Sequence, residues 1–196
     1  MCSRFYVDND INDRLEELFG ADSGFTKTGY DKAGDIRPSE EALILSGTGD
    51  SCSFEKMKWG FPCRDSKGLI INSRMENIEE RPAFANGIKN NRCLIPASGF
   101  YEWDEKREKV TFKPKEQGFF LFGGIFDHFN GEKRFTIITC NANASMEPVH
   151  DRMPFIIPSD RSDIWFSPDF RDLFSEEMPE LKLFREFQQM SLFDMK

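Results

Sequence analysis

A cysteine stands at position 2 of the chain, in the opening run Met-Cys-Ser-Arg-Phe. Removal of Met1, which is usual when the second residue is small, would make Cys2 the N-terminal residue. Cys2 would then carry an α-amine and a thiol on adjacent carbons, a nucleophilic pair that no internal cysteine offers. The position also fits a plainer interpretation, a small apolar residue that starts an edge strand, because free cysteines are commonly buried.

Polar residues alternate directly after an apolar run in the segment Leu-Ile-Ile-Asn-Ser-Arg-Met-Glu-Asn. Asn72, Arg74 and Glu76 are each two residues apart, so in a strand their side chains would share one face. Such a row of polar groups is a candidate site. The plainer alternative is that Asn72 caps a helix.

Two further segments place ionisable residues next to aromatic or apolar neighbours. Glu102 lies between Tyr101 and Trp103, and a carboxylate in aromatic surroundings loses water and becomes suited to proton transfer. His150 and Arg152 stand just before an apolar run. A solvated Glu102 and a loop histidine with ordinary partners are the plainer alternatives, so each residue by itself leaves the function open.

The composition excludes several kinds of protein. The 196 residues carry a net charge of −8, which argues against a general nucleic-acid coat but leaves room for a narrow basic groove. The five cysteines show no Cys-x-x-Cys spacing and only two histidines accompany them, so we expect neither a zinc site nor a disulfide framework. We find no signal peptide and no apolar membrane span. These features predict a soluble intracellular protein.

The hydrophobic pattern predicts an α+β fold, with a mostly antiparallel β core that curls toward a barrel and with peripheral helices. We expect helices at residues 8–20 and 159–166, and two short helices within 76–90 that are separated at Pro82. We expect strands at residues 41–46, 53–61, 92–96, 99–103, 109–113, 119–127, 134–142 and 153–158. Residues 23–35 should form a loop, and residues 180–193 fit either a helix or a strand. We expect a single domain over residues 1–196.

Six motifs follow one another along the chain: MCSRF, RPS, MKWGFP, NSRMEN, RCLIPASGFYEW and TCNANASMEPVHDRMPFIIP. In content and order they resemble the successive motifs of the SOS response-associated peptidase (SRAP) family. The resemblance runs from residue 2 to about residue 158, and the last forty residues match only loosely. The combination of Cys2 with the GFYEW and HDRMP runs is highly specific.

The resemblance implies a SRAP-like fold and a covalent sensor and shield of abasic sites in single-stranded DNA. It also implies a monomer that needs neither metal nor cofactor and acts in the cytoplasm, associated with the nucleoid when bound to DNA. The older family name reflects self-removal of the residue before the cysteine. The implied catalytic residues are Cys2 as nucleophile, Asn72 for positioning, Glu102 for proton transfer and His150 as an acid toward the sugar. The implied DNA contacts are Arg4, Arg74 and Arg152 to phosphates, and Pro38 and Trp59 to the strand or its bases.

The implied chemistry explains a cysteine at position 2. The open form of an abasic sugar is an aldehyde, which an amine converts to an imine; a thiol two carbons from that nitrogen then closes a thiazolidine ring. An α-amino group has a pKa of about 7.7–8.0, against about 10.4 for lysine, so much more of it is unprotonated near neutral pH. Ser3 stands where the family usually has glycine, so the substrate pose near Cys2 could differ.

Two other functions remain open at this point. A cysteine peptidase or N-terminal-nucleophile amidohydrolase could use Cys2 as nucleophile and His150 as base. A non-catalytic module could grip single strands or junctions, although the acidic balance counts against it. The first function, cross-linking with associated lyase-type chemistry through the imine, would leave a covalent protein–DNA band on a denaturing gel, and the other two would not.

Overall fold

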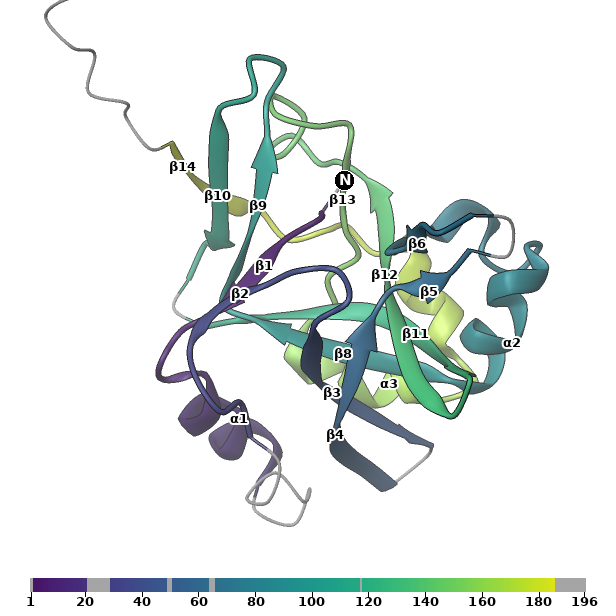
Figure 1. The fold of residues 1–196 in the computed structure, drawn as a ribbon. Coiled ribbons are helices and arrows are strands. Elements are labelled where there is room, and N and C mark those ends of the chain that lie inside the picture. Colours follow the sequence, from purple (N-terminus) through teal and green to yellow (C-terminus); the bar gives the residue numbers. More distant parts are fainter. Residues whose placement is uncertain (1, 21–28, 49–50, 64–65, 117, 186–196) are drawn as a thin grey trace, which may run out of the picture.

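Five strands close into a barrel in the computed structural model of the chain, which describes residues 2–20, 29–48, 51–63, 66–116 and 118–185 (Figure 1). The strands are β3 (Glu41–Thr48), β4 (Ser51–Trp59), β8 (Arg92–Ala97), β11 (Phe120–Phe129) and β12 (Glu132–Asn141). The ring runs from β11 through β8, β3 and β4 to β12, and β12 pairs again with β11. The predicted barrel is therefore confirmed, and it is closed.

The β12 strand is longer than its barrel pairing requires, and its far half carries two short strands. β7 (Asn72–Arg74) runs parallel to β12, and β13 (Arg152–Pro154) runs antiparallel to it. The β4–β12 pairing is also parallel, whereas the other pairings are antiparallel in the described part of the chain. This extension brings two segments that are far apart in sequence to one end of the barrel.

A second sheet lies beside the barrel, with the strand order β14 (Leu181–Arg185), β10 (Lys109–Pro114), β9 (Gly99–Trp103), β1 (Phe5–Val7) and β2 (Gly34–Ile36) (Figure 1). Its inner face packs on the barrel through aromatic rings. Phe100 lies 5.8 Å from Phe122 between ring centroids, and Phe5 lies 5.2 Å from Trp59. Phenylalanine, of which the chain has 21, thus builds much of the contact between the two sheets.

Helices cover the periphery, as predicted. They are α1 (Ile11–Phe19), α2 (Pro82–Asn90) and α3 (Ser162–Phe166), with 3-10 helices η3 (Met75–Asn77), η4 (Ser159–Arg161) and η5 (Phe170–Ser175). A small hairpin of β5 (Phe61–Pro62) and β6 (Leu69–Ile70) completes the described elements. Pro82 is the first residue of α2, where its missing N–H costs nothing.

Three expectations are refined by the structure. Residues 153–158 form only the short β13 and an isolated bridge between Phe122 and Ile156, instead of a full strand. The segment 180–193, which fitted a helix or a strand, forms β14 up to Arg185, and its remainder lies outside the described residues. Residues 23–28 of the expected loop also lie outside them. The α+β class, mostly antiparallel, is confirmed.

Candidate active site

The Cys2 side chain is fully buried where the chain enters β1, between the barrel and the second sheet. The side-chain amide of Asn72 donates a hydrogen bond of 2.9 Å to the Cys2 carbonyl oxygen. Asn72 is the first residue of β7, so β12 and the barrel fix its position. Its own carbonyl oxygen Oδ1 is buried and has no hydrogen-bond partner among the described residues, which leaves one acceptor for an incoming group.

Glu102 approaches the same place from the second sheet. It lies on the inner face of β9 with 4% of its surface exposed. The Tyr101 N–H donates to the Arg4 carbonyl at 3.0 Å, which holds residues 2–4 along the end of β9 that carries Glu102. Burial, and next the negative charge of Glu102, raise the pKa of the Cys2 thiol far above its ordinary value. The thiol is therefore neutral at physiological pH.

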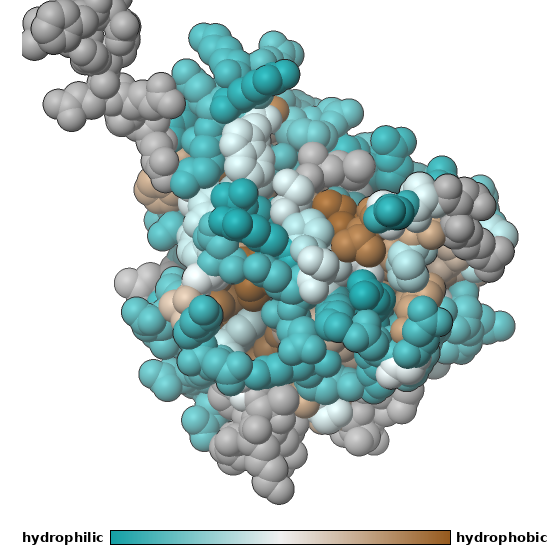
Figure 2. Space-filling view, viewed as in Figure 1, coloured by the Kyte–Doolittle hydropathy of each residue, from teal (hydrophilic) through white to brown (hydrophobic). Residues whose placement is uncertain are grey.

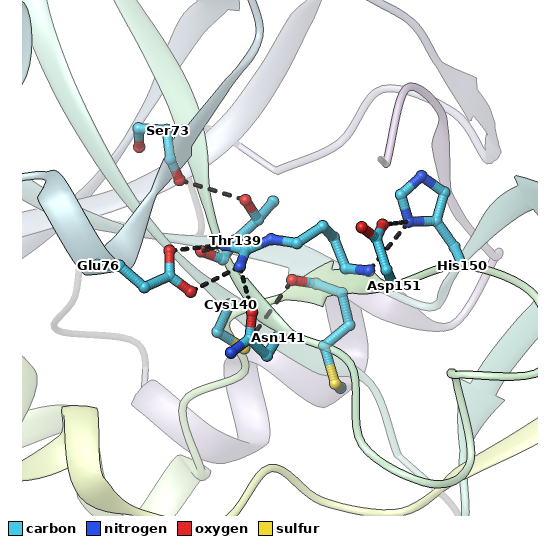
Figure 3. Close-up of polar contacts among 9 residues, drawn as sticks. Ser73, Glu76, Thr139, Cys140, Asn141, His150 and Asp151 are labelled. Carbon is cyan, nitrogen blue, oxygen red and sulfur yellow. Dashed lines mark hydrogen bonds and ion pairs between the residues drawn. The ribbon is translucent and has the colours of Figure 1, made fainter.

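His150 lies at the start of β13, half-buried, with contacts in its own segment (Figure 3). Its Nδ1 accepts the Arg152 N–H at 2.9 Å and lies 2.8 Å from Asp151 Oδ1. His150 also lines a cavity of about 600 Å³ together with Asn141 and Val149. The structure thus joins Cys2, Asn72 and Glu102, while the place of His150 in one shared site stays a prediction.

Arg152 is at the centre of a polar network with Glu76, Thr139 and Asn141, which are labelled in Figure 3. Its side chain is 8% exposed. Nη1 donates to Glu76 Oε1 and to Asn141 Oδ1, both at 2.6 Å, and Nη2 donates to Glu76 Oε2 at 2.9 Å and to the Thr139 carbonyl at 2.7 Å. These bonds use the four Nη protons of the guanidinium. The hydrogen bonds from Arg152 also lower the pKa of Glu76.

This network corrects the expectation that Arg152 grips a phosphate. A guanidinium whose Nη protons are all donated inside the protein has none left for a bidentate phosphate contact. Arg152 instead links two segments: its backbone N–H holds His150, and its side chain holds Glu76 two residues beyond β7. The sequence placed Glu76 next to Asn72 but contained no signal for its partner, which lies 76 positions away.

Trp59 is also corrected. It was expected to contact the DNA strand or its bases, but it is fully buried and its indole N–H donates to the Ile71 carbonyl at 2.9 Å. Its ring packs between Phe5 and Phe135. Because stacking needs an exposed face, Trp59 is a core residue and offers no platform for a base.

The other expected DNA contacts lie on the surface. Arg74 is exposed at the end of β7, and Pro38 is half-buried in the turn after β2. The Arg4 guanidinium lies 5.3 Å from the Trp103 ring centroid and 3.6 Å from an Asp35 oxygen. Trp103 was not among the expected contacts, although it follows Glu102 directly. Its half-exposed ring beside Arg4 is the aromatic surface that Trp59 lacks.

The described residues include no group of three or more His, Cys, Asp and Glu side chains placed to hold a metal ion. In the part of the chain that the structure covers, no helix is long and apolar enough to cross a membrane.

The fold and the site define a class of protein: an α+β protein with a closed barrel, in which a cysteine at position 2 is held between the barrel and a second sheet. The chain belongs to the SOS response associated peptidase (SRAP) family, whose family model matches residues 1–193. The resemblance drawn from the sequence motifs is thereby confirmed.

Two relatives and one solved structure show the extent of the likeness. The chain is 32% identical to the abasic site processing protein YoaM of Bacillus subtilis, over 86% of this chain and 80% of that protein. It is 31% identical to the abasic site processing protein YoqW of Bacillus phage SPbeta, over 88% and 83% of the two chains. A crystal structure of a Bordetella bronchiseptica protein shares the fold, with a TM-score of 0.77 at 19% identity over 94% and 99% of the two chains.

Proposed function

We propose that this chain processes abasic sites in single-stranded DNA by forming a covalent cross-link through Cys2 after Met1 is removed. The names of its relatives YoaM and YoqW support abasic DNA as the substrate. The observation that carries the proposal is the hydrogen bond from Asn72 to the Cys2 carbonyl. It holds the backbone of the residue whose amine would react, and it comes from Asn72, which the motifs also place at the site.

The reaction uses both nucleophilic atoms of Cys2. The unprotonated α-amine attacks C1′ of the open sugar, and the carbinolamine loses water to give an imine. The thiol sulfur then adds to the imine carbon, its proton passes to the nitrogen, and the five-membered thiazolidine is complete. The Cys2 thiol brings both the sulfur and that proton, so ring closure needs no further reactant.

Two neighbours would move the other protons. Glu102, buried beside Cys2, accepts a proton from the attacking amine and returns it to the departing water. His150, in its imidazolium form, would give a proton to the sugar ring oxygen when the ring opens. Asn72 Oδ1 accepts a hydrogen bond from the amine or a sugar hydroxyl.

The strand would be held by groups on the surface next to these residues. Arg74 and Arg4 bind phosphates on either side of the abasic sugar, and Pro38 contacts the strand. Arg152 acts through the segments that it links, because its guanidinium is engaged with Glu76.

A peptidase that uses Cys2 is less well supported. Cysteine peptidases need a thiolate, whose nucleophilicity comes from a lowered pKa. In this chain, burial and next the charge of Glu102 raise the pKa of the Cys2 thiol instead of lowering it.

Incubation with a single-stranded oligonucleotide that contains one abasic site tests the proposal. We expect a band that survives denaturing electrophoresis and adds the mass of the DNA to a protein that begins at Cys2. A protein that retains Met1 and cross-links equally well would overturn the aminothiol mechanism. Turnover of a peptide without a DNA adduct would favour the peptidase.

A further inference from the structure

The outer face of the second sheet, turned away from the barrel, carries aromatic and basic side chains. Along β9 and β10 the buried residues Phe100, Glu102, Val110 and Phe112 alternate with partly exposed ones. We use the name aromatic–lysine face for five residues on the outer side. They are Tyr6, Tyr101, Lys109, Lys113 and Phe184.

The strand register places these residues side by side. Thr111 pairs with Tyr101 on one side and with Phe184 on the other, so the two rings lie in one row across three strands. Tyr6 pairs with Gly99, and a Cβ at Gly99 would lie 2.5 Å from the Tyr6 hydroxyl. The missing side chain lets the Tyr6 ring lie flat across β9, where it stacks on Tyr101 at 5.2 Å.

Each lysine of the face lies over a ring. Lys109 Nζ is 4.9 Å from the centroid of Tyr101, and Lys113 Nζ is 5.8 Å from that of Tyr6 and 5.9 Å from that of Phe184. Phe184 has 49% of its surface exposed, which is unusual for so large an apolar residue. In Figure 2 the surface over β9 and β10 is teal and near-white, without a large brown patch.

The charge of this face differs from that of the whole chain, which is −8. Lys109 and Lys113 lie within it, and Lys182 pairs with Lys113 across β10 and β14. Two carboxylates, Asp35 and Asp8, lie beside it. Asp35 lies opposite Tyr6, accepts the Tyr101 hydroxyl at 3.1 Å and lies near Arg4. Burial, and then the neighbouring Tyr101 and Asp8, raise the pKa of the Tyr6 hydroxyl. A positive strip with rings between its charges complements a single strand, which presents phosphates and unpaired bases together.

We propose that the aromatic–lysine face binds the undamaged nucleotides of single-stranded DNA next to the abasic site, an inference that rests on the proposed function. Bases stack on Tyr101, Tyr6 and Phe184 while Lys109 and Lys113 contact the phosphates. The strand reaches this face from Cys2 through Arg4, whose carbonyl accepts the Tyr101 N–H. From β1 to β14 there are three inter-strand gaps of about 4.8 Å, roughly 14 Å in all.

Stacking is independent of sequence, because every base has a π-face. The face would therefore bind a single strand of any sequence. A protein needs this property when its target is defined by a missing base. An apolar peptide partner would fit it less well, since the face carries Lys109 and Lys113 among its rings.

Equilibrium binding to an undamaged single-stranded oligonucleotide, measured by fluorescence anisotropy at several salt concentrations, tests the proposal. We expect Tyr101→Leu and Phe184→Leu to weaken binding about five- to 150-fold, the effect of losing one stacked base. Lys109→Gln and Lys113→Gln should each reduce the salt slope by about 0.7.

Matched controls exist on the other sheet. Phe126 also lies under a lysine, with Lys133 Nζ 5.5 Å from its ring centroid, so Phe126→Leu repeats the aromatic change away from the face. Lys89, exposed on α2, serves for the charge change as Lys89→Gln. Thermal melts of all variants show which of them fold. Controls that bind as weakly as the face variants would overturn the proposal.

The outcome can be separated from that of the proposed function. Suppose that wild type cross-links to abasic DNA but the folded variants of the aromatic–lysine face bind the undamaged strand normally. The proposed role of the face is then refuted, and the proposed function stands. If wild type forms no cross-link but its binding depends on Tyr101 and Lys113, the proposed function fails and the face is supported. Loss of binding in the lysine variants but not in the tyrosine and phenylalanine variants would refute base stacking.

Discussion

Asn72 donates its side-chain N–H to the backbone carbonyl of Cys2 across a separation of 70 positions in the sequence. Because the acceptor is a backbone atom, the contact positions the residue whatever its side chain does. Asn72 is itself held by β12 through the short strand β7. The barrel therefore sets the place of the N-terminal residue.

Removal of this contact should slow cross-linking. In Asn72→Ala the Cys2 carbonyl loses its donor, and the loss of one such hydrogen bond in a buried place costs about 1–3 kcal/mol. We expect the rate of adduct formation to fall about five- to 150-fold, as followed by denaturing gel over time. Asn90→Ala, an exposed change on α2, is the control. Equal rates for the two variants would mean that Asn72 has no positioning role.

Substitutions of Cys2 separate the amine from the thiol. Cys2→Ala keeps the α-amine, so we expect no stable adduct but an imine that borohydride traps, and strand cleavage because the unclosed imine has time to eliminate the 3′ phosphate. Cys2→Ser could close an oxazolidine, which hydrolyses more readily, so its adduct should be weaker and labile to heat. Denaturing gels run with and without borohydride treatment measure the adducts of both variants.

The peptidase alternative predicts different results for these Cys2 variants. It expects Cys2→Ala to lose every activity and no variant to give a reducible adduct. If Cys2→Ala binds DNA normally and borohydride still traps nothing, attack by the α-amine is wrong.

The sequence predicted much of the fold, but it did not predict which polar residues already have partners inside the protein. The strand pattern was sufficient for the barrel, and the motifs pointed to Cys2, Asn72 and Glu102, whose roles stay a prediction. Trp59 was misjudged although Met57, Trp59 and Phe61 alternate with polar residues, a period that is typical of a strand face turned to the core.

Arg152 shows a second reason why the sequence alone could not predict the contacts of the site. A guanidinium is suited both to phosphates and to carboxylates, and the choice depends on which acceptor the fold brings near. Glu76 reaches Arg152 because β7 and β13 both pair with β12. Pairing of such short strands depends on tertiary contacts, so local sequence contains little of it.

Glu102→Gln should slow cross-linking without preventing it. The amide keeps the size of the side chain but cannot take up or release the proton that imine formation moves. General acid–base catalysis contributes typically about 10²- to 10⁴-fold, and we expect a rate loss of that order. Single-turnover time courses at saturating DNA measure the rate apart from binding. An unchanged rate would remove Glu102 from the mechanism, and Glu80→Gln, an exposed change, is the control.

The Glu76–Arg152 pair should make stability depend on pH in the acid range. Arg152 lowers the pKa of Glu76 in the folded chain below its ordinary value of 4.5, so the pair stabilises the fold above that pH. This contribution is lost as the pH falls through the lowered folded-state pKa. The Glu76 side chain is 43% exposed, and solvent screening therefore keeps the effect small.

Glu76→Gln measures this contribution. We expect its free energy of unfolding to be lower than that of wild type at neutral pH by up to about 1 kcal/mol. The difference should shrink as the pH is lowered below 4.5, the ordinary pKa of the glutamate side chain. Urea titrations of both proteins at pH 7 and at the lowest pH where they still fold give the difference in free energy of unfolding at each pH. A difference that grows toward acid pH would contradict the assignment.

Arg74 and Arg152 should respond differently in DNA binding, although both were expected from the sequence to hold phosphates. Arg74 is exposed at the end of β7, and Arg152 has donated its Nη protons to Glu76, Asn141 and Thr139. We expect Arg74→Gln to reduce the salt slope of single-strand binding by about 0.7, one lost phosphate contact. Arg152→Gln should leave the slope unchanged and lower the thermal midpoint, because it leaves Glu76 and Asn141 without their donor. Anisotropy titrations from low to high salt, with Lys89→Gln as the charge control, give the slopes. A reduced slope for Arg152→Gln together with an unchanged slope for Arg74→Gln would show that the ion pair with Glu76 opens when DNA binds, and that Arg152 is a phosphate ligand after all.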